Sequence, residues 1–191
     1  MPLASSCLKA SGRATGVRRR VLVGITEGCL TLHVELPLLF VDIDGVLNPY
    51  EGECPDGFVE HWLFPEDDEP VRVCATHGEW LHELATVYEL VWGSSWTATE
   101  RALIATVLDL PEFHGAVDLP LGQSDPALKV PAVDLVAGDR PLAWIDDLLT
   151  LDAWAWATAR AAPTLLIAVD PSIGLTRPQV DELAAWATGD G

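Results

Sequence analysis

The chain has 191 residues, 49% of them hydrophobic, which is enough for one compact domain with a core and too few for two ordinary domains. Its formal net charge is −18. Five of the eleven basic residues precede residue 21, so residues 21–191 carry six basic against 29 acidic side chains, a balance of −23. Such a surface repels polyanions and argues against binding to extended DNA or RNA.

We expect residues 1–35 to form a flexible or poorly defined leader. The first 20 are rich in Ser, Ala, Gly and Arg, as solvated tails are. Glu27 and Gly28 break the following apolar run well before signal-peptide or membrane-spanning length, which predicts no membrane contact. The four cysteines show no CxxC spacing, so we expect no disulfide framework and a reducing, cytoplasmic location. Alternating apolar residues over 30–36 predict an edge strand or an extended lead-in.

Strands and helices alternate through the expected domain, residues 36–191. An apolar run at 37–43 predicts a strand buried on both faces, and a Pro- and Gly-rich stretch at about 46–75 predicts a small flap hairpin. The elements expected after the flap are helix 78–88, strand 89–92, helix 97–108, strand 116–119, a helix opening near 131, strand 141–145, helix 151–160, strand 164–169 and a helix from about 178. This order predicts a doubly wound three-layer α/β/α sandwich with a mainly parallel, Rossmann-like sheet.

Polar residues follow the apolar runs at points where strand ends would meet. They are Asp42 and Asp44 in Asp42-Ile43-Asp44-Gly45, Ser94 after Leu90-Val91-Trp92-Gly93, and Asp146-Asp147 after Leu142-Ala143-Trp144-Ile145. Lys129 is the single lysine after Lys9. In doubly wound sheets, ligands bind at the carboxyl ends of the strands. We therefore expect these side chains to form one site.

In this order, the four motifs resemble those of the haloacid dehalogenase superfamily, over residues 38–147. The resemblance implies a phosphatase in which Asp42 attacks phosphorus and becomes an aspartyl phosphate, and Asp44 acts as general acid and then general base. Ser94, Lys129 and Gly45 would contact the phosphate. Phosphoryl transfer needs such an in-line oxygen nucleophile, and it needs positive charge around the equatorial oxygens.

The same resemblance implies Mg²⁺ as cofactor. Two carboxylates next to an incoming phosphate repel it, and a hard cation with oxygen ligands cancels that repulsion. The implied ligands are Asp42, the backbone carbonyl of Asp44, and Asp146. Asp147 either belongs to the metal site or orients Lys129, and both roles stay open.

The two places where superfamily members carry a cap domain are short here, so the chain resembles a capless member. An open site implies a bulky substrate, a macromolecular phosphate, or a small substrate enclosed by a partner subunit, which leaves a homo-oligomer open. The domain also resembles small relatives of phosphatase domains in RNA-repair proteins. A nucleic-acid end phosphatase is therefore an alternative, although the charge of −23 opposes it.

Other functions and residue roles stay open beside the phosphatase. The fold could serve as a non-catalytic phosphate- or protein-binding domain, and a dehalogenase or a phosphoglucomutase-like transferase would use related motifs. The serine motif could be shifted by one residue, to Ser95. Taken alone, each motif residue could equally be a cap, a turn or a polar loop residue.

Two further groups of residues have both a functional and a structural interpretation. Cys54, His61, Cys74 and His77 lie at the predicted flap and would form a zinc site if its two halves converged, although scattered Cys and His are more often structural. Trp62 and Trp96 would stack on an aromatic leaving group, or would simply pack.

Overall fold

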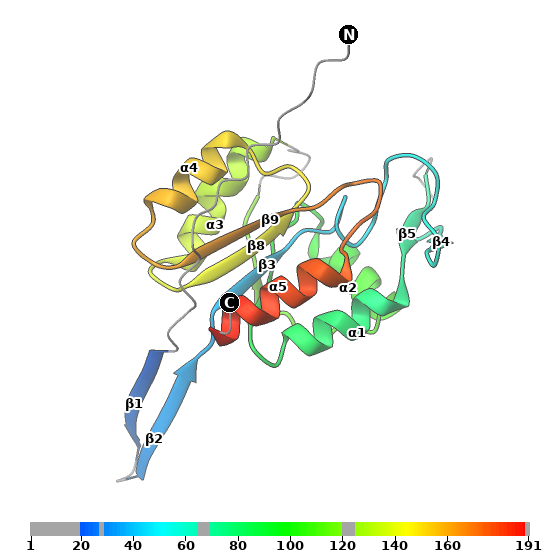
Figure 1. The fold of residues 1–191 in the computed structure, drawn as a ribbon. Helices are drawn as coiled ribbons and strands as arrows, with labels where there is room; N and C mark the ends of the chain where they lie inside the picture. Colours follow the sequence, from blue (N-terminus) through cyan, green and yellow to red (C-terminus); the bar gives the residue numbers. More distant parts are fainter. Residues whose placement is uncertain (1–19, 27–28, 65–68, 120–124, 190–191) are drawn as a thin grey trace.

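The computed structural model describes residues 20–26, 29–64, 69–119 and 125–189, and only the backbone of residues 20–34. At its centre lie five parallel strands in the order β7-β6-β3-β8-β9 (Figure 1). The strands are β3 (Leu38–Val41), β6 (Glu89–Trp92), β7 (Gly115–Ala116), β8 (Leu142–Asp146) and β9 (Thr164–Ala168). Val41 is in register with both Trp92 and Ile145. The C-terminal ends of β3, β6 and β8 therefore meet at one edge of the sheet.

Helices cover both faces of this sheet (Figure 1). The helices α1 (Ala75–Leu84), α2 (Ala98–Val107) and α5 (Arg177–Thr188) lie on one face, and α3 (Lys129–Ala137) and α4 (Leu151–Ala159) lie on the other. The predicted doubly wound three-layer sandwich with a parallel sheet is confirmed. None of the described helices combines the length and the apolarity needed to cross a membrane.

The core explains why β3 is a continuous apolar run. Side chains alternate along a strand, so Leu39 and Val41 pack with α1, α2 and α5, while Leu38 and Phe40 pack with α3 and α4. All four side chains are at most 2% exposed. A strand with helices on both faces has no solvent side for polar residues, and its acids can appear only where it ends.

The start of α3 differs from the prediction in a way that matters for the site. The helix begins at Lys129, two residues before the predicted start at Pro131, and follows a short 3-10 helix, η1 (Pro126–Leu128). Asp125 caps η1 by accepting a 2.9 Å hydrogen bond from the backbone N–H of Ala127. Pro131 is tolerated because first-turn N–H groups have no intrahelical partner. Lys129 is thereby fixed at the first position of a helix.

The flap is a small hairpin over the strand ends. Its strands β4 (Val59–His61) and β5 (Val71–Val73) pair antiparallel. Val71 and Val73 are buried in the core beside α1, so the hairpin is anchored on one side. In the part of the chain that the structure describes, no larger insertion interrupts the α/β order, in agreement with the expected lack of a large cap domain.

Residues 20–26 and 29–35 form strands, where the sequence suggested a poorly defined leader. The strands β1 (Arg20–Thr26) and β2 (Cys29–Glu35) pair with each other as an antiparallel hairpin that extends away from the body (Figure 1). The strand expected at 30–36 is thus present, but it is not an edge of the central sheet. Its partner was missed because Val21-Leu22-Val23 is a continuous apolar run without alternation. The tail expected before Arg20 lies outside the described residues.

Candidate active site

Two strand ends and one helix start bring an ammonium group between two carboxylates. Asp42 follows β3, Asp146 ends β8, and Lys129 begins α3. The Lys129 Nζ donates hydrogen bonds to Asp42 Oδ2 and, at 2.7 Å, to Asp146 Oδ2. Asp42 is 4% exposed and Asp146 is fully buried. The lysine therefore bridges two acids that are largely removed from bulk water.

Further donors and opposing charges set the electrostatics of this group. The backbone N–H of Ile43 donates to Asp42 at 2.8 Å, and Trp144 Nε1 donates to Asp146 at 3.1 Å. Burial raises the pKa of Asp42, and the charge of Asp146 raises it further, against the attraction of Lys129. Burial lowers the pKa of Lys129, but the charges of Asp42 and Asp146 outweigh burial, and the net shift is upward. Lys129 therefore stays cationic.

A third carboxylate completes a group of oxygen donors. Asp42, Asp146 and Asp147 each place one carboxylate oxygen within 4.8 Å of the other two, and among the described residues this is the group of acid, His or Cys side chains that could hold a metal ion. A set made of oxygen donors suits a hard divalent cation. The Asp44 side chain is not part of this group, so its expected contribution through the backbone carbonyl stays a prediction.

Asp147 is oriented by a tyrosine from the chain segment between β3 and β4. The Tyr50 hydroxyl donates to Asp147 Oδ2 at 2.8 Å, whereas the Lys129 ammonium donates to the other two acids. Burial raises the pKa of Asp147. Gly45 borders the same carboxylate, and its φ of +70° is a conformation that favours glycine. A Cβ at Gly45 would lie 2.4 Å from Asp147 Cγ.

Both side-chain oxygens of Asp44 accept hydrogen bonds. Asn48 Nδ2 donates to Oδ1 at 3.0 Å, and Trp96 Nε1 donates to Oδ2 at 2.8 Å. Asp44 is half-buried and lines the same cavity as Asp42. Neither Asn48 nor Trp96 was predicted to contact Asp44, because the polar contacts of these residues depend on the turn after β3 and the loop after β6.

The two candidate serines line different parts of the site. Ser94 is 2% exposed, and its Oγ accepts a 3.3 Å hydrogen bond from the backbone N–H of Trp96. Ser95 lines the cavity that contains Asp42, whereas Ser94 lines a smaller neighbouring cavity of about 190 Å³, which Ser95 shares. Both serines therefore remain candidates for a phosphate contact.

The cavity above Asp42 has a volume of about 760 Å³. Its lining includes the charged residues Asp42, Asp44, Lys129 and Asp147 and the aromatic residues Tyr50, Phe64 and Trp96. Three more acids line it, namely Glu69, Glu100 and Asp125, together with one arginine, Arg72. The described lining is thus concave, partly aromatic and predominantly acidic.

A family model matches most of the chain. The model describes the HAD domain in Swiss Army Knife RNA repair proteins, and it matches residues 38–180. The chain belongs to this family. The resemblance to the haloacid dehalogenase superfamily is thereby confirmed, and the HAD domain with its three clustered aspartates fits a hydrolase that uses a divalent metal. A comparison with curated proteins gave no match.

The suggested zinc site does not form among the described residues of this HAD domain. Cys54 Sγ lies 3.9 Å from the carbonyl oxygens of Pro55 and Phe58, and His77 Nε2 is 3.0 Å from the carbonyl oxygen of Leu175. No group of three or more potential ligands includes the cysteines or histidines that the structure describes.

The two tryptophans proposed for stacking differ in position. Trp62 is 66% exposed and does not line the cavity of the HAD domain, so nothing in its surroundings supports a leaving-group contact. Trp96 lines the cavity, but its indole N–H is bound to Asp44. Tyr50 and Phe64, which also line the cavity, were not singled out, because an aromatic residue in a Pro-rich stretch gives no local signal of a site.

The space beside Gly45 yields a matched pair of substitutions. Gly45 and Gly52 have φ of +70° and +68°, but a Cβ at Gly52 meets nothing within 4 Å. Either change to Ala should lower the free energy of unfolding by about 1–2 kcal/mol, because alanine is strained in a left-handed backbone conformation. Gly45→Ala should lower it by about 1–3 kcal/mol more, because the new methyl group overpacks against Asp147. Gly45→Ala should also reduce the rise in Tm that Mg²⁺ produces. Urea unfolding measures the first effect, and thermal denaturation with and without Mg²⁺ measures the second. Equal losses of stability and equal Mg²⁺ effects in Gly45→Ala and Gly52→Ala would contradict the close contact between position 45 and Asp147.

Proposed function

We propose that the chain is a magnesium-dependent phosphomonoester hydrolase that works through an aspartyl phosphate on Asp42. The main observation behind this proposal is that Lys129 contacts both Asp42 and Asp146. Lys129 and Asp42 line the same cavity as Asp44 and Asp147. The order of these residues along the chain resembles that of the HAD motifs, and their proximity supports the proposal. Membership of the HAD family supports the proposal at the coarser level of a hydrolase.

In the first step, one carboxylate oxygen of Asp42 attacks phosphorus while the bond from phosphorus to the ester oxygen breaks. Asp44 gives its proton to the departing oxygen, so that the alcohol leaves as a neutral molecule. The Lys129 ammonium, held beside Asp42, offers positive charge to the phosphoryl oxygens as charge shifts. The product of this step is the aspartyl phosphate.

In the second step, a water molecule attacks the same phosphorus and gives a proton to Asp44. The bond between Asp42 and phosphorus breaks, and inorganic phosphate leaves. One water is consumed, and one alcohol and one phosphate are produced. Asp44 regains the proton that it lost in the first step, so the site is ready for the next substrate.

The residues present also fit the expected cofactor. Asp42, Asp146 and Asp147 would hold Mg²⁺ because each offers a carboxylate oxygen to a common point. When bound, the ion supplies positive charge for the phosphate oxygens. Gly45 keeps space for the Asp147 carboxylate, and Tyr50 orients it.

The nucleophile is tested by replacing its attacking oxygen. Asp42→Asn should reduce release of phosphate from p-nitrophenyl phosphate by at least about three orders of magnitude, because it removes covalent catalysis. EDTA should inactivate the wild type, and Mg²⁺ should restore it. Asp152→Asn, at an exposed acid on α4, serves as control and should keep wild-type activity. If no phosphoester in a broad panel is hydrolysed with metal, the non-catalytic alternative is favoured instead.

The serine register is tested by two neighbouring substitutions. Trp96 uses Ser94 Oγ as an acceptor, which leaves the Ser94 hydroxyl proton free to be donated to a phosphoryl oxygen. Ser94→Ala should therefore lower kcat/KM by about 10- to 100-fold, and Ser95→Ala by only a few-fold. Steady-state kinetics with p-nitrophenyl phosphate compares them. A larger loss for Ser95→Ala would move the phosphate contact to Ser95.

A nucleic-acid end phosphatase is the second candidate, and the family description favours it because it refers to RNA repair proteins. The acids Glu69, Glu100 and Asp125 in the cavity wall oppose a long polyanion. We therefore expect a small phosphomonoester to be hydrolysed with a higher kcat/KM than a short RNA oligonucleotide with a terminal phosphate. Phosphate release from both, at low and at physiological salt, decides between them; a preference for the RNA would establish the second candidate.

A further inference from the structure

The orientation of Asp44 is determined by two donors from different parts of the chain. Asn48, in the turn after β3, donates to Oδ1 at 3.0 Å, and the indole N–H of Trp96, after β6, donates to Oδ2 at 2.8 Å. A half-buried carboxylate that lines a cavity would otherwise adopt several rotamers. With one donor at each oxygen, the plane of the carboxylate is fixed.

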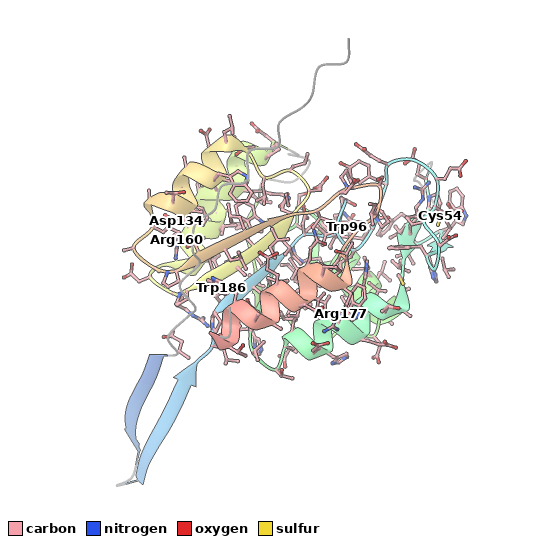
Figure 2. The ribbon with its side chains drawn as sticks, viewed as in Figure 1. Cys54, Trp96, Asp134, Arg160, Arg177 and Trp186 are labelled. Atoms are coloured by element: carbon pink, nitrogen blue, oxygen red, sulfur yellow. The ribbon has the colours of Figure 1, made fainter. Side chains whose placement is uncertain are left out.

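Trp96 is itself held on several sides, which makes it a rigid donor. Its backbone N–H donates to Ser94 Oγ at 3.3 Å, and its carbonyl accepts from Arg101 Nη1 at 2.7 Å. Phe64 of the flap packs edge-on against the indole, with ring centroids 5.4 Å apart. Thr97, the next residue, starts α2 with a capping box. Figure 2 shows Trp96 between the central sheet and the flap that carries Cys54.

Asn48 connects Asp44 to strand β5 of the flap. Its Oδ1 accepts a 2.8 Å hydrogen bond from the backbone N–H of Arg72, in β5, while its Nδ2 donates to Asp44. Asn48 is only 8% exposed. Both the oxygen and the nitrogen of the side-chain amide are therefore hydrogen-bonded, so the amide has one favourable orientation. The flap thus reaches Asp44 by two routes, through Phe64 and Trp96 and through Arg72 and Asn48.

We propose that Trp96 and Asn48 are positioning residues that aim Asp44 at the leaving-group oxygen and connect its orientation to the flap. The inference rests on the proposed function, because it assigns to Asp44 the proton transfer described above. Donors from an indole and an amide suit this role, because each carboxyl oxygen keeps a lone pair when Asp44 is protonated and both contacts persist in either state. Displacing a catalytic group by about 1 Å can cost roughly 10²-fold in rate.

The test compares two leaving groups. An alkyl phosphate such as glycerol phosphate needs a proton on its leaving oxygen, whereas p-nitrophenolate departs readily without one. Trp96→Phe keeps an aromatic ring and removes the N–H. The measured quantity is kcat/KM, because it reports the steps up to formation of the aspartyl phosphate and not the later attack of water, in which Asp44 serves both substrates alike. It should fall by about 10- to 100-fold with the alkyl phosphate and by less than about 3-fold with p-nitrophenyl phosphate. Trp62→Phe, on the flap but outside the cavity, should change neither rate.

Asn48→Asp gives a second, independent variant. It keeps an oxygen acceptor for the Arg72 N–H and loses the donor to Asp44, so it should produce the same dependence on the leaving group. An equal loss of kcat/KM on both substrates would mean a structural role and would overturn the inference, as would unchanged kcat/KM with the alkyl phosphate. Inactive wild-type enzyme on every phosphoester would instead count against the proposed function.

A spectroscopic measurement tests the contact without relying on activity. In ¹⁵N-labelled protein, Asp44→Ala should shift the indole N–H proton signal of Trp96 upfield, because the acceptor is lost. The indole signal of Trp62 is the internal control and should stay in place. A Trp96 signal that does not move would overturn the positioning role even if the enzyme is active.

Discussion

Two buried carboxylates at neighbouring strand ends require a cation between them. β3 and β8 are adjacent and parallel, so their C-terminal acids, Asp42 and Asp146, are forced close together by the sheet itself. Ionised carboxylates repel each other strongly where water is excluded, and each carries a desolvation cost of several kcal/mol. Lys129 meets both acids from the first position of α3. The position at which that helix starts is therefore set by local capping, and it also places the cation that the two acids require.

Around this charged centre, neighbouring residues fix the orientations of the Asp147 and Asp44 side chains. Gly45 leaves room for Asp147, Tyr50 orients it, and Asn48 and Trp96 orient Asp44. Most of these contacts come from segments that are loops or turns, yet each loop is fastened to a rigid element. Position and direction therefore have different structural origins, because the sheet sets where the charges lie and the loops set where they point.

The sequence predicts the parts of this arrangement that depend on periodicity. A strand buried on both faces must be apolar throughout, so β3 and the acid at its end were visible, and Lys129 stood out because the chain has so few lysines. Contacts between distant side chains were not predictable: Tyr50 meets Asp147, and Trp96 meets Asp44, only after the sheet has formed. The choice between Ser94 and Ser95 depends on a single turn after β6, which composition does not determine. The β1–β2 hairpin escaped prediction because one of its strands lacks alternation.

The place of β3 in the sheet also bears on how the chain folds during synthesis. β3 can pair with β6 early, but its other neighbour, β8, emerges only after residue 141, and the two pair from Leu38 to Leu142. Until then, one edge of the most apolar strand in the sheet is open, and such edges invite pairing with other chains. Pairing over so long a separation also slows folding. The strand that leads to the proposed nucleophile, Asp42, thus keeps one unpaired edge until β8 has been synthesised.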